Sequence, residues 1–210
     1  MSRLENKRNF YKRKVRRKMS KGEIQYRYIS PEIRAEKGEN GEKHIQGYFS
    51  VFNEAYEMFP GFTETIDPHA FDNAISGDIR ALWNHNQDIV LGRTTAKTLT
   101  LSIDSHGLYG DITINNDDSD AVNAHARVAR GDVSQCSFAF DILDEELTQM
   151  PDGSWHSNIK AVTLYEVSPC TFPAYQQTSV TARAREIKEK EKKEIEFWKK
   201  EMKERLKKWH

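Results

Sequence analysis

Apolar and polar side chains alternate along most of residues 22–182, with the two-residue period that is typical of β-strands. The alternation predicts strands at residues 23–29, 44–52, 79–85, 97–104, 107–114, 133–143 and 159–168. Ser105-His106-Gly107 separates two of these segments and predicts a hairpin turn. The turn sequence Met150-Pro151-Asp152-Gly153 predicts that the last two strands pair antiparallel.

Helical patterns are fewer. Asp67 stands at an N-cap position before Pro68, so a short helix is expected over 67–75, preceded by a loop over 53–60. The spacing of apolar residues predicts a second helix over 118–132. Many strands and few helices predict an α+β domain, built as a mainly antiparallel, closed or strongly curved β-barrel with a few flanking helices.

The C-terminal segment has a different pattern. Ile195, Trp198, Met202, Leu206 and Trp209 recur every three or four residues and predict an amphipathic, highly charged helix. Such a helix is only marginally stable by itself, so its apolar stripe needs a partner. The partner could be the same domain, another protein's helix or a second copy of this chain, and the segment could also be a removable tail.

Charge divides the chain in the same way. The 32 Lys and Arg balance the 32 Asp and Glu. Residues 1–21 nevertheless hold ten basic residues and one acid, residues 183–210 hold twelve and seven, and the region between holds ten and twenty-four. We therefore expect a flexible basic arm at 1–21, a globular domain at 22–183 and a helical tail at 184–210. The arm could also bind phosphate or an acidic surface.

Several classes of protein are disfavoured. No apolar run approaches the 18–20 residues of a membrane span, and the basic N-terminus has no apolar segment of a secretory signal behind it. Cys136 and Cys170 are too few for a disulfide framework and form no zinc motif, so a reducing cytosolic setting is expected. Asp67, His69 and Asp88 match no ligand spacing, so neither a metal nor a cofactor is expected.

Three residues could carry chemistry. His85 follows a predicted strand, where a rigid element aims a side chain that a loop exposes. Ser137 belongs to the small and polar face of its strand, which leaves room above it, whereas the neighbouring Cys136 belongs to the apolar face and is expected in the core. Cys136 is the rival nucleophile. Glu166 shares its strand face with apolar residues, so it needs a histidine or arginine partner.

The pairing of the last two strands decides whether Ser137 and Glu166 are neighbours. A two-residue turn would place Ser137 opposite Ser168, with Glu166 on the same face. The sequence Pro151-Asp152-Gly153 fits a three-residue turn better, and that turn would place Glu166 opposite Phe138 on the other face. A β-bulge would restore the first arrangement, so the sequence permits the Ser137–Glu166 neighbourhood without requiring it.

An ordered set of motifs resembles the phage prohead protease family, over about residues 22–183. The motifs are Gly47-Tyr48-Phe49-Ser50-Val51-Phe52-Asn53, Ile66-Asp67-Pro68-His69-Ala70-Phe71, Asn84-His85-Asn86, Leu91-Gly92-Arg93-Thr94, Gly107-Leu108-Tyr109-Gly110, Arg130-Gly131-Asp132, Cys136-Ser137-Phe138-Ala139-Phe140, Leu164-Tyr165-Glu166-Val167-Ser168 and Phe172-Pro173-Ala174-Tyr175. These enzymes mature the capsids of tailed phages and are similar in fold to the herpesvirus assemblins, which are β-barrel serine proteases.

The resemblance implies a serine endopeptidase with Ser137 as nucleophile, His85 as base and Glu166 as candidate third member. It implies action in the bacterial cytoplasm, inside the assembling prohead. The implied substrates are scaffolding segments of the major capsid protein, a separate scaffold and the protease itself, and the two terminal segments could be packaging or autoprocessing segments. One alternative is a non-catalytic assembly factor with a protease-like fold. Another is a nucleic-acid-binding role, which the acidic body would limit to the arm.

Overall fold

The computed structural model describes residues 14–18, 24–29, 33–38 and 41–172, with isolated positions between 189 and 204. The chain divides into two compact units, Met1–Tyr175 and Gln176–His210. Every residue of the predicted C-terminal apolar stripe lies outside the described positions, so that helix and the expected segment boundaries stay predictions. Within the described part, no helix is long and apolar enough to cross a membrane.

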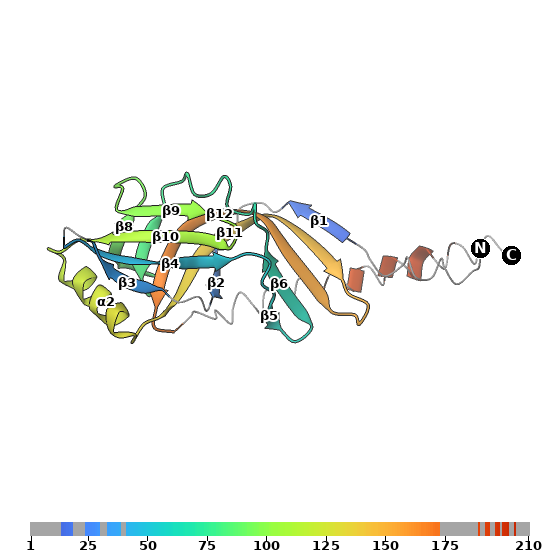
Figure 1. Ribbon diagram of the computed structural model, residues 1–210. Helices are drawn as coiled ribbons and strands as arrows, with labels where there is room; N and C mark the ends of the chain where they lie inside the picture. Colours follow the sequence, from blue (N-terminus) through green and yellow to red (C-terminus); the bar gives the residue numbers. More distant parts are fainter. Residues whose placement is uncertain are drawn as a thin grey trace. The chain divides into compact units, whose positions relative to one another are not determined.

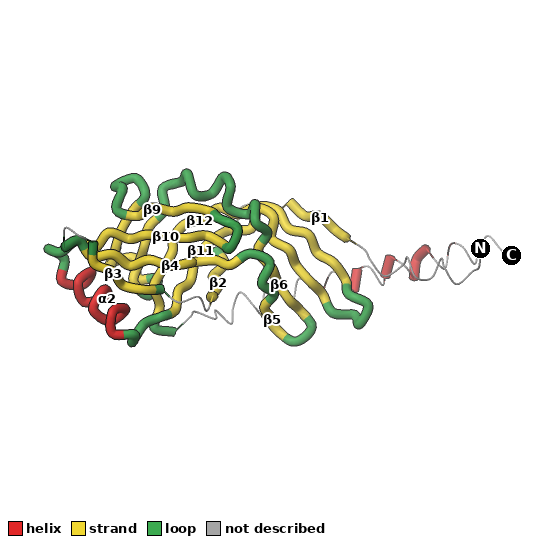
Figure 2. Tube along the Cα trace, in the orientation of Figure 1, coloured by secondary structure: helices red, strands yellow, loops and turns green. Residues whose placement is uncertain are grey.

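The described residues of the first unit form two β-sheets and helix α2 (Figures 1 and 2). The larger sheet consists of β1 (Lys14–Lys18), β2 (Gln25–Ile29), β5 (Tyr56–Phe59), β6 (Phe62–Ile66), β7 (Arg80–Trp83), β8 (Asn86–Arg93), β11 (Gln135–Gln149) and β12 (Trp155–Cys170). The smaller sheet has the order β3 (Arg34–Lys37), β4 (Lys43–Val51), β10 (Gly107–Ile114) and β9 (Leu99–Ile103).

The expectation of a closed or strongly curved barrel is wrong. A barrel requires one hydrogen-bonded ring of strands. Among the described residues, the strand pairings instead form two separate open sheets: β3 and β9 end the smaller sheet, and neither pairs with a strand of the larger one. The apolar faces are covered by packing, because one buried hydrophobic cluster draws residues from both sheets and from the helix. Burial of the apolar faces therefore does not require closure.

Phenylalanines dominate this shared core. Phe49, Phe71, Phe138 and Phe140 are all fully buried. Phe138 stacks on Phe140 with ring centroids 4.9 Å apart and meets the edge of Phe71 at 5.6 Å. The ring of Phe49 passes so close to Gly110 that a Cβ there would lie 2.6 Å from a ring carbon, so this position needs glycine. The core face of β11 is thereby fixed, and its other face is left for Ser137.

Helix α2 (Ser119–Arg130) follows the predicted pattern. Asp118 caps its first turn, and Gly131 ends it with a left-handed φ of 84°. The buried face consists of Ala121, Ala124, His125 and Val128, and the helix lies against β3 and β4 (Figure 1). The helix expected over 67–75 is wrong, because that segment is a series of turns with bonds such as Ala74 N–H to Phe71 O. The loop expected over 53–60 contains β5.

The long β11–β12 hairpin is the central element of the larger sheet. Met150 pairs with Ser154 around the three residues Pro151-Asp152-Gly153, and Gly153 adopts φ 89°. This is the turn class in which a left-handed residue follows a tight turn. The strands predicted over 133–143 and 159–168 are confirmed as an antiparallel pair, and both extend further toward the turn.

Candidate active site

His85 lies at the tip of the β7–β8 hairpin. Trp83 pairs with Asn86, so Asn84 and His85 form a two-residue turn, and both have positive φ, at 53° and 60°. Positive φ at both central residues defines a type I′ turn, whose twist matches that of the flanking strands. Asn84 ties the tip to the end of β12: its N–H donates to Pro169 O at 3.0 Å, and its Oδ1 accepts from Thr171 N–H at 2.8 Å.

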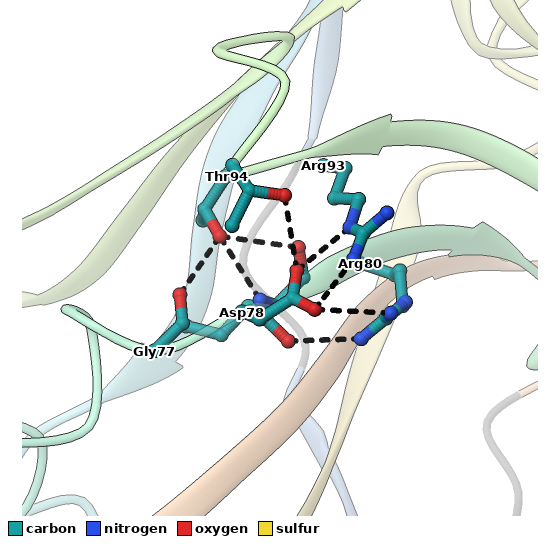
Figure 3. Close-up of polar contacts among 7 residues, drawn as sticks. Gly77, Asp78, Arg80, Arg93 and Thr94 are labelled. Atoms are coloured by element: carbon teal, nitrogen blue, oxygen red, sulfur yellow. Dashed lines mark hydrogen bonds and ion pairs between the residues drawn. The ribbon is translucent and has the colours of Figure 1, made fainter.

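A polar cluster closes the other end of this hairpin (Figure 3). Arg93 donates from Nε and Nη2 to the carboxylate of Asp78 at 2.7 and 2.6 Å, and Arg80 lies 3.1 Å from the same group. Thr94 accepts from Ile79 N–H at 2.9 Å and donates to Gly77 O at 2.8 Å. The hydrogen bonds from Arg93 hold the pKa of Asp78 well below its usual range. Hydrogen bonds therefore hold the hairpin that carries His85 at its tip and at its other end.

His85 has an acidic partner. Its Nδ1 lies 2.5 Å from Oε1 of Glu166, and both side chains are largely buried, at 14% and 9% exposure. An ionised carboxylate only accepts, so Nδ1 carries the proton and Nε2 is left as the acceptor nitrogen. Ser168 holds the carboxylate from the other side, donating from Oγ to Oε2 at 2.5 Å, and it accepts from His85 N–H at 3.3 Å. Glu166 thus has the histidine partner that its sequence position required.

The β11–β12 register brings Ser137 and Glu166 onto one face. Near the turn the strands follow the three-residue-turn register, with Gln149 opposite Trp155. The register shifts between Ala139 and Phe140, so Ala139 lies opposite Glu166 and Ser137 lies opposite Ser168. This is the bulge that the sequence permitted. It converts a pairing that would separate the two residues into one that makes them near neighbours.

The Ser137 hydroxyl is hydrogen-bonded to the backbone and not to His85. Its Oγ is buried and donates to the backbone oxygen of Arg27 at 2.9 Å, and within the described residues no hydrogen bond joins it to His85. The room expected above Ser137 is not found, because Ser137 is fully buried. β2 pairs along the adjoining edge of β11, with Tyr28 opposite Ser137. The same strand covers the histidine, since the rings of Tyr26 and His85 meet edge to face with centroids 4.8 Å apart.

The two cysteines occupy different environments. Cys136 is fully buried on the core face, as predicted, and donates to Tyr48 O. Cys170 lies on the site face, with Sγ 3.6 Å from Nε2 of His85. Burial, followed by the charge of Glu166, raises the pKa of the Cys170 thiol to about 12, and burial also raises the pKa of Cys136. Neither thiol is ionised near neutral pH, which disfavours cysteine as the nucleophile.

Sequence reasoning missed Ser168, Cys170 and Tyr26. The first two follow Glu166 at steps of two along β12, so strand alternation alone puts them on its face. Tyr26 needed knowledge of which strand covers β11, and no local signal gives that. Together the residues supply a hydroxyl, an imidazole with one acceptor nitrogen and a carboxylate that orients it, which are the groups that acyl transfer requires.

Comparison with known proteins identifies the family. The family model described as caudovirus prohead serine protease matches residues 30–193. The prohead protease of Enterobacteria phage HK97 is 30% identical over 149 residues, which cover 69% of this chain and 62% of that protein's length. The structure of the bacteriophage T4 capsid assembly protease, gp21, aligns with a TM-score of 0.41 at 12% identity, covering 71% of this chain and 99% of that chain. The chain belongs to the caudovirus prohead serine protease family.

Proposed function

We propose that this chain is a serine endopeptidase of phage capsid maturation. It cleaves scaffolding segments of the capsid protein, or a separate scaffold, and it also cleaves itself, inside the assembling prohead in the bacterial cytoplasm. The observation that carries the proposal is the His85–Glu166 hydrogen bond beside Ser137, in a chain of this family. The HK97 relative is named a prohead protease, and this chain spans 62% of its length.

The mechanism assigns one role to each group. The Ser137 hydroxyl turns from Arg27 O toward Nε2 of His85, which takes its proton as Oγ attacks the substrate carbonyl carbon. Glu166 holds Nδ1 and stabilises the charged imidazolium. The imidazolium then protonates the leaving amine, and water releases the acyl group from Ser137 by the reverse sequence of proton transfers.

Co-expression with the major capsid protein tests the proposal. The wild-type chain shortens the capsid protein, as measured by intact mass, and Ser137→Ala abolishes the shortening. Ser105→Ala is the matched control, because Ser105 is an exposed turn residue, and it leaves shortening unchanged. Equal shortening by Ser137→Ala would show that Ser137 is not the nucleophile. A wild-type chain that promotes assembly without shortening anything would instead support the non-catalytic assembly factor.

A further inference from the structure

The strand β2 contacts two of the proposed catalytic residues, Ser137 and His85. Ser137 Oγ donates to the backbone oxygen of Arg27 at 2.9 Å, and the ring of Tyr26 covers that of His85. These contacts come from two consecutive residues of one extended segment. A substrate for acyl transfer must contact the same two residues. Its carbonyl carbon has to reach the nucleophile, and its chain has to lie beside the base.

The N-terminal region supplies this segment. β1 pairs with residues 144–148 of β11 and β2 pairs with residues 136–140, both antiparallel and along the same edge. An open strand edge is a template on which a further extended peptide can add by main-chain hydrogen bonding. The family match begins at residue 30, directly after β2. The strand that covers the site therefore precedes the part of the chain that the family shares.

Arg27 inserts its side chain into a closed acidic site. It is 2% exposed, and Glu64 of β6, which is fully buried, holds it with both carboxylate oxygens, at Nε and at Nη2. The guanidinium also lies 5.3 Å from the centroid of Phe140 and donates to Tyr26 O at 2.9 Å. A two-oxygen contact to a planar guanidinium, reinforced by an aromatic face, is selective for arginine over other side chains.

From these contacts we propose that β2 is an internal occupant of the substrate-binding edge of β11, and that Glu64 makes this edge selective for arginine before the scissile bond. This inference rests on the proposed function. Arg27 takes the place of the substrate residue whose carbonyl Ser137 attacks, and the edge of β11 binds the substrate as an added strand. The preferred substrates are extended segments with arginine at this position.

The cleavage step at this position balances without a further reagent. Ser137 Oγ forms a bond to the carbonyl carbon of the arginine as its proton passes to His85. The carbon–nitrogen bond to the next residue breaks, and His85 returns the proton to the departing amine. Water then replaces Ser137 on the carbonyl carbon. For β2 itself, the products would end at Arg27 and begin at Tyr28.

The first test uses the full chain and a synthetic peptide with the sequence of residues 24–31. We expect a cut after its arginine, and we expect replacement of that arginine by citrulline to lower kcat/KM by about 10²-fold or more, because citrulline keeps the shape and loses the charge. Equal kcat/KM for the two peptides would overturn the inference. Absence of a Ser137-dependent cut in this peptide, by a chain that does shorten capsid protein, would overturn it as well. Loss of capsid protein shortening would overturn the proposed function instead, so the two failures are distinguishable.

The second test concerns the internal occupant. Arg27→Lys keeps the positive charge but loses the two-oxygen contact, so β2 should release more easily and kcat/KM for the arginine peptide should rise by about tenfold. Arg34→Lys, at an exposed arginine of β3, is the matched control and should change nothing. An unchanged or lower kcat/KM for Arg27→Lys would contradict the role of β2 as occupant, whatever the peptide preference.

Discussion

At the scale of single residues, the site depends on how Glu166 is held. Its carboxylate receives His85 on one oxygen and Ser168 on the other, within a largely buried environment. A buried carboxylate is costly unless it is paired in this way. The arrangement leaves Nε2 of His85 as the acceptor nitrogen, which is the one that the proposed mechanism needs for the serine proton.

Glu166→Gln tests this role. The amide keeps the shape but cannot stabilise a charged imidazolium, so kcat for capsid protein cleavage should fall by about 10²- to 10⁴-fold. The far-ultraviolet circular dichroism spectrum should be unchanged, which separates loss of catalysis from loss of fold. Near-normal turnover by the variant would exclude Glu166 from the catalytic group.

The thiols give a second test at this scale. Because Cys136 is fully buried and the pKa of Cys170 is raised to about 12, neither should react with iodoacetamide at pH 7. Activity should survive prolonged treatment, and peptide mass mapping of the native chain should find both cysteines unmodified. Stoichiometric inactivation, with the label on Cys170, would favour a thiol nucleophile over Ser137.

Individual residues were predictable only in part. The sequence identifies three candidate residues: His85 by its position at a strand end, Ser137 by its strand face, and Glu166 by the cost of an unpaired acid on an apolar face. Their mutual approach does not, because a β-bulge between Ala139 and Phe140 decides it and bulges have no reliable local signal. The cover supplied by Tyr26 depends on a strand far away in the sequence.

At the scale of elements, the β7–β8 hairpin carries His85, the proposed base, at its tip. Its type I′ turn requires positive φ at Asn84, a conformation that costs a β-branched residue about 1–2 kcal/mol. Most strands were predictable from alternation, since a period of two needs only local sequence. The segment 67–75 was not, because its helix-start signal does not prevent it from folding as turns that bury Phe71.

Substitutions at Asn84 test the turn. Asn84→Gly keeps the backbone conformation and loses the exposed side-chain contacts with Thr171, so it should lower the free energy of unfolding by less than about 1 kcal/mol. Asn84→Val strains the turn and should be more destabilising and less active than the glycine variant. Urea unfolding and capsid protein cleavage measure the two effects. The reverse order of stability would contradict the assigned turn.

The Asp78 cluster predicts a pH dependence. A lowered pKa means that the contribution of Asp78 to stability is present above its unfolded pKa of about 4 and is lost as pH falls through the lower folded pKa. The wild type should therefore have a higher Tm than Asp78→Asn at pH 7, and the difference in Tm should shrink as pH falls below about 4. Thermal unfolding between pH 2 and 7 measures this. A difference that grows toward acid would refute the assignment.

At the scale of the whole molecule, the uneven distribution of charge along the chain corresponds to a strand pairing. The N-terminal basic region contributes β1, which pairs with β11 where that strand reads Asp144-Glu145-Glu146. Charge segregation along the chain thus corresponds to pairing between its basic beginning and its acidic body. The sequence pattern identifies the blocks but not this pairing, nor the two open sheets, because both depend on contacts between distant segments.

The central claim is that Ser137 is the nucleophile of a capsid maturation protease. The most direct measurement adds diisopropyl fluorophosphate to the chain while it is cleaving capsid protein and locates the adduct by peptide mass mapping. The account predicts one adduct, on Ser137, and its loss in His85→Ala. An adduct on Ser168 or Cys170, or labelling of Ser137 that does not depend on His85, would contradict it.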